Sequence, residues 1–474
     1  MFWIPIDRSL EIPLTRQVYE QIRRRILHAE LAAGECLPPT RQLATHLGTS
    51  RNIIVEAYEQ LLAEGYIEAR QGSGTYVAEG ACLAQREQTV SFTTYEAEQE
   101  QQDTADLIDF RSGLPALDMF PRQMWGQTAK QVCMETSNSI FGYGHPEGTN
   151  HLRHTLCRYL KRTRGVECHP DQLVITAGAT QALSLVAHLL LSQGDEVIIE
   201  DPITQEIQTI FSSPGSVLYP IAVDELGMRT DLLPLHKTPG FIFVTPSHQF
   251  PLGGVLPIQR RIELIQYARA VDCFIVEDDY DSEFRYQGAP INSLQGLDPD
   301  RVIYIGTFSK ILSPALRLGY LILPPALTKR CKDLKWFTDL HTPSIEQLTL
   351  AHFIDERYLE RHIRKMKKVY KTRRDYVKLC LIEQFGTLVN VSGDSTGLHL
   401  IAEFSNITFS NEKVNELMKE HKVKIYPVEL HTIEKGRHRN KVILGYGNLT
   451  MEEIEEGVRR LKQALIPGLT SCNR

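Results

Sequence analysis

Two apolar runs in this chain are each followed by residues that could do covalent chemistry. Lys310 lies five residues beyond the run 302–305, and Asp278 and Tyr280 follow the run 274–276. A lysine amine can form a Schiff base with an aldehyde, and a carboxylate can keep the nitrogen of an aromatic ring protonated. Taken singly, Lys310 could be a surface lysine and Asp278 a loop carboxylate, so the prediction rests on their joint occurrence at the ends of successive runs.

Groups that could bind a phosphate accompany these residues. A Gly-Ala-Thr turn follows the run 174–176 and opens a helical pattern, and the free amides of a helix N-terminus bind phosphate. Arginine and hydroxyl side chains are common further donors. The candidate phosphate ligands are Gly178, Ala179, Thr180, Thr307, Ser309 and Arg317. A Schiff-base lysine, a carboxylate and a phosphate cradle together predict a site for pyridoxal 5'-phosphate (PLP).

The elements that must position these groups alternate along residues 108–474. Short runs rich in β-branched residues lie at 174–176, 197–199, 241–244, 274–276 and 302–305. Helical patterns such as 181–191 and 259–270 lie between many of them. This alternation predicts an α/β fold with a largely parallel sheet, in which ligands bind beyond the carboxyl ends of the strands.

Residues 1–77 have a different pattern, three helices and a hairpin. A helix is predicted within 13–30 and a second over 41–47, and Gly48 then supplies the turn before a third helix, which Ser50 caps. The predicted inner face of the third helix is Ile54, Ala57, Tyr58, Leu61 and Leu62. Two short strands, 66–70 and 75–77, complete a winged helix-turn-helix.

A winged helix-turn-helix reads double-stranded DNA through the first turn of its third helix and through its wing. The candidate DNA-binding residues are Arg41, Ser50, Arg51, Asn52, Gly72 and Ser73. Arginine and asparagine can pair with guanine and adenine edges. Residues 1–77, called the head below, hold eight basic and nine acidic residues, so DNA contact must come from charges gathered on one face. The competing interpretation is a helical docking module with a solvated arginine on its surface.

Residues 78–107 are predicted to form an acidic, flexible linker. They lose all periodicity and hold seven acidic residues against the single Arg86, a composition that cannot bury a core. Such a linker would permit two subunits of a dimer to exchange their heads. The predicted domains are therefore 1–77, 78–107 and 108–474.

The bulk composition is that of an ordinary globular protein, with 42% hydrophobic residues and a net charge of −6. No apolar run approaches the roughly 20 residues that a membrane helix needs, and the first residues lack the layout of a signal peptide. We therefore expect a cytoplasmic protein without a membrane partner. The nine cysteines include no pair with the spacing of a zinc motif, so we expect no metal site.

Two family resemblances follow from these motifs. The head resembles the GntR family of bacterial regulators, through the segments 37–44, 49–52, 64–66 and 72–77. Residues 108–474, called the body below, resemble fold-type I aminotransferases, through the segments 109–115, 245–251, 277–284 and 306–310. The chain as a whole resembles the MocR/GabR-type regulators, which join such a head to such a body. This resemblance implies a smaller C-terminal subdomain after the sheet.

The resemblance implies a role for each candidate residue of the body. Lys310 would hold PLP, Asp278 would pair with its ring nitrogen, and Tyr280 would hydrogen-bond its ring oxygen. Arg317 and its neighbours would hold the phosphate. Arg439, shortly before a final apolar run, would clasp the carboxylate of a ligand.

The chain departs from the aminotransferase pattern at two positions. Phe250 stands where an asparagine usually bonds the ring oxygen, and Thr204 stands where an aromatic usually stacks on the ring. Both departures argue against efficient transamination. The favoured function is a dimeric, PLP-dependent transcriptional regulator that senses an amino acid, an amine or PLP itself through an aldimine at Lys310. The alternative is an active aminotransferase with an accessory DNA-binding head.

Overall fold

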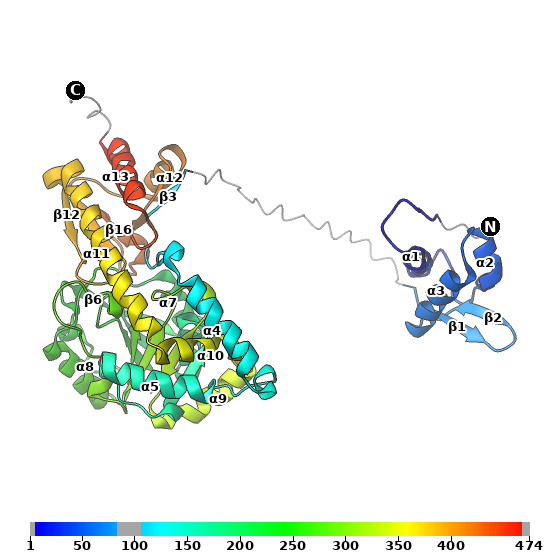
Figure 1. The fold of residues 1–474 in the computed structure, drawn as a ribbon, viewed down its shortest axis with the longest axis horizontal. Coiled ribbons are helices and arrows are strands. Elements are labelled where there is room, and N and C mark those ends of the chain that lie inside the picture. The colour runs from blue at the N-terminus through cyan, green and yellow to red at the C-terminus, as the bar shows by residue number, and fades with distance from the viewer. Residues whose placement is uncertain (1–4, 83–105, 467–474) are drawn as a thin grey trace. The chain divides into compact units, whose positions relative to one another are not determined.

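The computed structural model describes residues 5–82 and 106–466, which belong to two compact units. Figure 1 draws both, the head in blue and the body from cyan to red. The predicted linker 78–107 lies mostly outside the described residues, so the boundaries of the three predicted domains stay predictions. Within the described residues, every helix is too short or too polar to cross a membrane.

The head is a winged helix-turn-helix, as the sequence predicts. Its elements are the helices α1 (Leu14–Leu27), α2 (Thr40–His46) and α3 (Arg51–Ala63) and the antiparallel strands β1 (Ile67–Arg70) and β2 (Gly74–Val77). Val18, Ile54 and Leu61 are among the side chains at the centre of its core. The prediction that Leu62 faces inward is wrong, because it is 36% exposed. Each helical residue turns by about 100°, which carries Leu62 past the buried stripe that includes Leu61.

The body is built on an eight-stranded sheet. Its spatial order is β4 (Leu173–Thr176), β11 (Gly319–Ile322), β10 (Val302–Thr307), β9 (Phe274–Asp279), β8 (Phe241–Val244), β5 (Glu196–Asp201), β6 (Val217–Asp224) and β7 (Gly227–Met228). Only β11 and β7 run against the others, so the prediction of a largely parallel sheet is confirmed.

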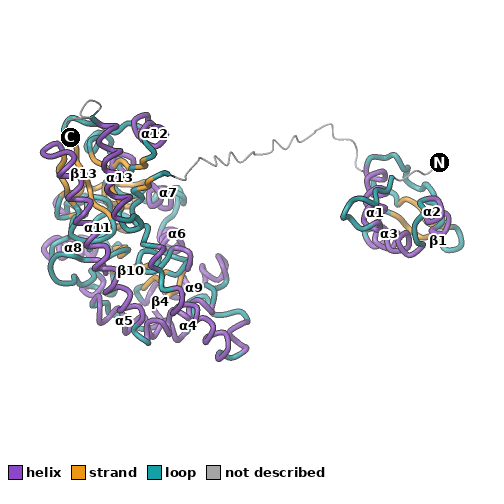
Figure 2. Tube along the Cα trace, turned by 45° about the horizontal axis from the view of Figure 1, so that its top comes forward, coloured by secondary structure: helices purple, strands orange, loops and turns teal. Residues whose placement is uncertain are grey.

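Helices cover both faces of this sheet, which explains why its strands are continuous apolar runs (Figure 2). One face packs against α6 (Ala179–Leu190), α7 (Gln205–Ser212) and α9 (Pro325–Asp339). The other packs against α5 (Asn150–Arg164), α8 (Ile258–Ala270) and α10 (Ser344–Asp355), and α4 (Arg122–Glu135) lies beside α10. Along β5, Val197 and Ile199 belong to the first core and Ile198 to the second, as strand alternation requires.

A smaller C-terminal subdomain completes the body, as the resemblance implies. Its antiparallel sheet has the order β12 (Val389–Ser392), β13 (His399–Phe404), β16 (Lys441–Gly445) and β15 (Tyr426–Pro427). Its helices are α11 (Tyr358–Phe385), α12 (Asn411–Glu420) and α13 (Met451–Leu465). The first strand of the body, β3 (Ile108–Asp109), pairs with β14 (Val423–Lys424), so the start of the body lies within this subdomain.

Candidate cofactor site and candidate DNA-binding face

The candidate cofactor residues meet at one edge of the large sheet. Strands β9 and β10 are parallel neighbours, with Ile305 beside Asp278, so the residues that follow both strands emerge together. Strand β4 runs in the same direction on the far side of β11 and delivers Gly178 to the same edge. The sequence prediction that three strand ends converge is therefore borne out by the topology.

Lys310 is partly buried at this edge, in a setting that favours its neutral amine. Burial lowers the pKa of Lys310, while the carboxylates of Asp281 and Asp278 oppose that shift. A Cβ atom added to Gly113 would lie 2.8 Å from Lys310 Nζ, so the segment at the start of the body passes directly over the amine. A lysine with a lowered pKa presents the unprotonated amine that attacks a carbonyl carbon.

Asp278 offers a carboxylate oxygen that lacks a partner. Its side chain is buried, and Oδ1 accepts no hydrogen bond from the described residues. Burial, and then the negative charge of Asp279, raises the pKa of Asp278 to about 7. An unsatisfied buried oxygen is costly, and the protonated ring nitrogen of PLP is a donor that would satisfy it. Asp278 therefore fits the role that the sequence gave it.

Tyr280 joins a buried cluster that the sequence did not predict. Its hydroxyl donates to the backbone oxygen of His248 at 3.0 Å, and His248 Nδ1 lies 3.0 Å from the carboxylate of Asp281. The ring of His248 also packs, tilted, against that of His399 with centroids 5.0 Å apart, and His399 Nε2 lies 2.9 Å from the Pro251 oxygen. The sequence assigned His248 no chemistry and did not single out Asp281, since their contact joins two separate loops.

Two groups of side chains in the described residues have the spacing to hold a metal ion. One is His248, Asp281 and His399, and the other is Glu416, Glu420 and His421. In the first group, His248 and His399 already hydrogen-bond Asp281 and Pro251. The expectation of no metal site stays a prediction.

The phosphate candidates form a cradle at the start of α6. Gly178 is the N-cap residue with a φ of 85°, and it brings no side chain to the first turn of the helix. Arg317 Nη2 donates to the Ala177 oxygen at 2.6 Å, and a Cβ added to Gly178 would lie 3.0 Å from that nitrogen. Thr307 Oγ1 donates to Ser309 Oγ at 3.0 Å beside the lysine. Amides, a guanidinium and two hydroxyls suit a phosphate, so the residues present fit PLP.

The two departures from the aminotransferase pattern have structural roles here. Thr204 caps α7, because its Oγ1 accepts from the Ile207 amide at 3.3 Å. The Phe250 ring packs against Tyr280, with centroids 6.2 Å apart, and against His431 at 5.5 Å. An apolar ring thus stands beside Tyr280 at the position where aminotransferases usually have an amide.

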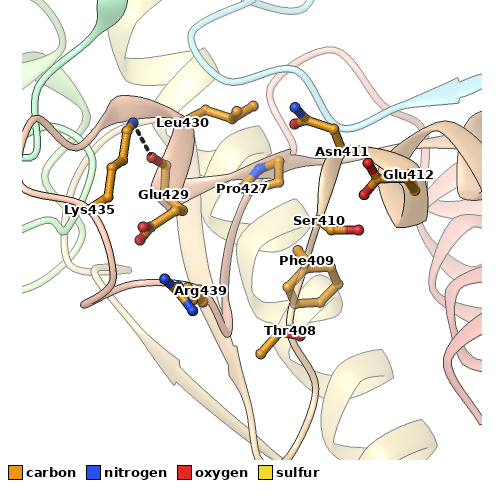
Figure 3. Close-up of a pocket in the computed structure, with 10 residues that line it drawn as sticks. All are labelled: Thr408, Phe409, Ser410, Asn411, Glu412, Pro427, Glu429, Leu430, Lys435 and Arg439. Atoms are coloured by element: carbon orange, nitrogen blue, oxygen red, sulfur yellow. Dashed lines mark hydrogen bonds between the residues drawn. The ribbon is translucent and has the colours of Figure 1, made fainter.

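Arg439 is the one cofactor-site candidate that the structure does not bring to the others. It lines a pocket of about 460 Å³ in the C-terminal subdomain, with Phe409, Glu429 and Lys435 (Figure 3). It precedes β16, and the opposite end of that strand is Gly445. Gly445 pairs with His399, the first residue of β13, whose ring contacts His248. Arg439 lies two residues before β16, and the four steps along that strand from Lys441 to Gly445 span about 13 Å. The expected carboxylate contact therefore lacks geometric support.

The candidate DNA-binding residues lie exposed on the head. Arg41 is in the first turn of α2, Arg51 and Asn52 begin α3, and Gly72 and Ser73 form the tip between β1 and β2. Ser50 is the N-cap residue of α3, but its hydroxyl caps no amide, contrary to the usual pattern for serine. The sequence did not single out Arg8, whose Nη2 donates to the Gly48 oxygen at 2.6 Å and so adds a cation at the turn.

Comparisons with known proteins agree with this arrangement. Residues 14–77 match the family "Bacterial regulatory proteins, gntR family", and residues 105–461 match "Aminotransferase class I and II". The chain is similar to the "Probable rhizopine catabolism regulatory protein MocR" of Rhizobium meliloti, with 34% identity over 97% of this chain and 95% of that protein. It is also similar to the "HTH-type pyridoxine biosynthesis transcriptional regulator PdxR" of Corynebacterium glutamicum, with 32% identity over 76% of this chain and 77% of that protein.

A solved structure similar to the body is a kynurenine aminotransferase from Pyrococcus horikoshii, crystallised in complex with PMP, KYN as substrates and KYA as products. It is 28% identical, with a TM-score of 0.72, and the match covers 78% of this chain and 93% of that one.

Proposed function

Because this chain belongs to the MocR-type transcriptional regulators, in which a gntR-family DNA-binding head precedes an aminotransferase class I and II body, we propose that it couples DNA binding to a small amine captured at Lys310. The protein is a PLP-dependent transcriptional regulator, and its head binds DNA. The effector, the subunit arrangement and the roles of single residues belong to the proposal. The proposal also includes a cytoplasmic location, where the head would meet DNA.

The observation that carries the proposal is the set of groups around Lys310. When bound, PLP supplies an aldehyde carbon with which amines condense. Lys310 would hold that carbon, and Asp278 would accept from the ring nitrogen. The Tyr280 hydroxyl, which donates to the His248 oxygen here, would donate to the ring oxygen instead. The Gly178 turn, Thr180, Ser309 and Arg317 hold the phosphate. Lys310 would compete with a ligand amine for that carbon, so the contacts of its side chain at this edge of the sheet would differ between the ligand-free and the ligand-bound protein.

We propose that the head reads DNA through Arg51 and Asn52, with Arg41 and the Gly72–Ser73 wing tip on phosphates. A ligand can shift DNA affinity only if it binds two arrangements of the protein unequally. The displaced lysine and the new ligand contacts provide that difference.

We further propose a homodimer formed by the body. Several apolar side chains of the body are strongly exposed in the single chain: Met134, Phe141, Tyr143 and Phe337 are 62–87% exposed. The Tyr143 ring lies 6.4 Å from that of His341, which follows α9, so these segments adjoin. Exposed apolar clusters mark interfaces, and a dimer would present two heads to two half-sites.

The test uses the full chain loaded with PLP and a duplex selected from a random-sequence pool by that chain. Amines and amino acids are added while visible absorbance and DNA affinity are followed. The proposal predicts that one ligand shifts the absorption band, leaves PLP intact and changes DNA affinity. The Lys310→Ala variant should lose the lysine-bound band and the ligand response. Steady conversion to pyridoxamine phosphate without an effect on DNA would favour the aminotransferase alternative instead.

A further inference from the structure

We infer that Arg111, rather than Arg439, binds the carboxylate of the effector, and that the effector is therefore an amino acid rather than a simple amine. The inference rests on the proposed function, because it names the ligand class of the same site. It is carried by the path of the segment 108–113, by the free guanidinium of Arg111 and by the charges around Lys310.

The backbone at the start of the body fixes the side on which Arg111 lies. Ile108 and Phe110 are buried in the core of the C-terminal subdomain. Asp109 points the other way and accepts a hydrogen bond from the Tyr426 hydroxyl at 2.9 Å. Side chains alternate along extended backbone, so Arg111 emerges on the side of Asp109, away from the core.

That side faces the candidate cofactor site. Two residues after Arg111, a Cβ atom added to Gly113 would lie 2.8 Å from Lys310 Nζ, so the backbone there passes close to the amine. Tyr426 packs in the same small cluster as Phe250, which in turn contacts Tyr280. The backbone oxygen of Arg111 packs against Gly445 at the end of β16, which holds this segment in place.

The guanidinium of Arg111 is exposed, and no hydrogen bond or ion pair to it is found within residues 5–82 and 106–466. Two other arginines of the site region are engaged: Arg164 pairs with Asp279 at 2.7 Å, and Arg317 bonds the Ala177 oxygen. Arg111 is thus a cation at the mouth of the site that the described part of the protein leaves without an anion. A bidentate bond to a carboxylate is the contact that an arginine makes best.

The charges around Lys310 suit a zwitterion. Burial is the largest influence on the pKa of Lys310 and lowers it. The carboxylates of Asp281 and Asp278 raise this pKa, and the positive charge of Arg111 lowers it. Glu206, on α7, adds a further negative charge. The site therefore attracts an ammonium group through its carboxylates and offers one cation for an accompanying anion.

Arg439 lines a different pocket, with Phe409, Glu429 and Lys435. It lies before the start of β16, and Val442, Ile443 and Leu444 of that strand come between it and Gly445. Ile443 is fully buried against Ile401 and Val428. The C-terminal arginine suggested by the sequence is therefore replaced by one at the start of the body.

The test compares amino acids with the amines that lack only their carboxylate, such as lysine with cadaverine and alanine with ethylamine. The PLP-loaded full chain is titrated with each, and the shift of its visible absorption band gives an apparent affinity. Arg111→Gln should weaken the affinity for the responding amino acid by about tenfold to a hundredfold, because one charge-assisted bidentate contact is lost. Its affinity for the matching amine should stay within about twofold.

Two further variants make the result decisive. Arg439→Gln is the control and should match the wild type with every ligand. Arg111→Lys keeps the charge but loses the bidentate geometry, so it should fall between wild type and Arg111→Gln. Equal losses for amino acid and amine in Arg111→Gln, or a selective loss in Arg439→Gln, would overturn the inference and leave the proposed function standing. A wild-type band that no amino acid and no amine shifts would overturn both.

Discussion

Replacement of Asp278 by asparagine should stabilise the cofactor-free protein while weakening its hold on PLP. The side chain is buried, Oδ1 has no partner among the described residues, and burial raises the pKa of Asp278 from 3.8 to about 7. The folded state therefore binds the proton more tightly than the unfolded state. For a carboxyl group with a raised pKa, the free energy of unfolding falls as the pH rises from about 4 to about 7, and it stays lower above that range.

The size of this change in the free energy of unfolding follows from the pKa shift of Asp278. A difference of about 3 pKa units, at about 1.4 kcal/mol each, makes the ionised carboxylate cost the cofactor-free fold at most about 4 kcal/mol at pH 8. An asparagine side chain at this position has nearly the same shape and no charge. Asp278→Asn should accordingly raise the free energy of unfolding by up to that amount at pH 8, and by little at pH 4.

The neighbouring Asp279 provides a matched control, because its replacement should lower the free energy of unfolding instead of raising it. Its carboxylate pairs with Arg164 Nε at 2.7 Å and accepts from the Tyr304 hydroxyl, and both partners are buried. Asp279→Asn leaves a buried guanidinium without its counter-charge, which costs about 3–5 kcal/mol.

The assay is urea unfolding of the cofactor-free full chain at pH 4, 6 and 8, followed by the fluorescence of tryptophans such as the buried Trp125. Equilibrium dialysis measures PLP affinity in parallel. The reasoning fails if Asp278→Asn destabilises the protein at pH 8 as Asp279→Asn does, since that would mean that the fold itself satisfies the Asp278 carboxylate.

Three further outcomes are expected. Arg51→Ala should weaken DNA binding by about 1–3 kcal/mol in fluorescence anisotropy and leave the PLP absorption band unchanged. The control Arg24→Ala, on α1, should change neither DNA binding nor the band; retained DNA affinity in Arg51→Ala would refute the head assignment. Arg317→Gln should weaken PLP binding about tenfold or more in dialysis, and unaltered binding would remove it from the phosphate cradle. Cys157 and Cys168, with sulfurs 3.3 Å apart, should lose two hydrogen atoms and join as a disulfide when hydrogen peroxide is added; peptide mass spectrometry that finds both still as thiols would contradict this.

The sequence predicts the cofactor edge well because that edge is a consequence of strand direction. Parallel strands end at the same edge, so Lys310 and Asp278 had to meet once their runs were recognised as neighbouring strands. The turn at Gly178 follows for the same reason. The helix face at Leu62 and the ends of helices and strands moved by one or a few residues, because they depend on packing rather than on pattern. The Ser50 hydroxyl caps no amide, and Arg439 lines a separate pocket.

The arginine at the mouth of the site could not be predicted in the same way. Arg111 lies near enough to influence the charge of Lys310 because β3 pairs with β14, more than 300 residues later, and local periodicity carries no signal of such a pairing. The contact between His248 and Asp281 likewise joins two loops that only the folded sheet brings together. A signal for Arg111 did exist, since it lies in the segment 109–115 that resembles aminotransferases, two residues from a glycine that must pass close to the lysine.

The same arginine supplies enough binding energy for a sensor to work without any turnover. A charge-assisted contact contributes about 1.5–3 kcal/mol, and each 1.4 kcal/mol of differential binding changes an equilibrium about tenfold. One such contact, made at Arg111 in only one arrangement of the body, would therefore change DNA affinity by about tenfold to a hundredfold. Linkage then requires DNA to change the affinity for the amino acid by the same factor. Catalysis needs repeated proton transfer and product release, but regulation needs only this difference, and Thr204 and Phe250 can cap and pack without taking part in it.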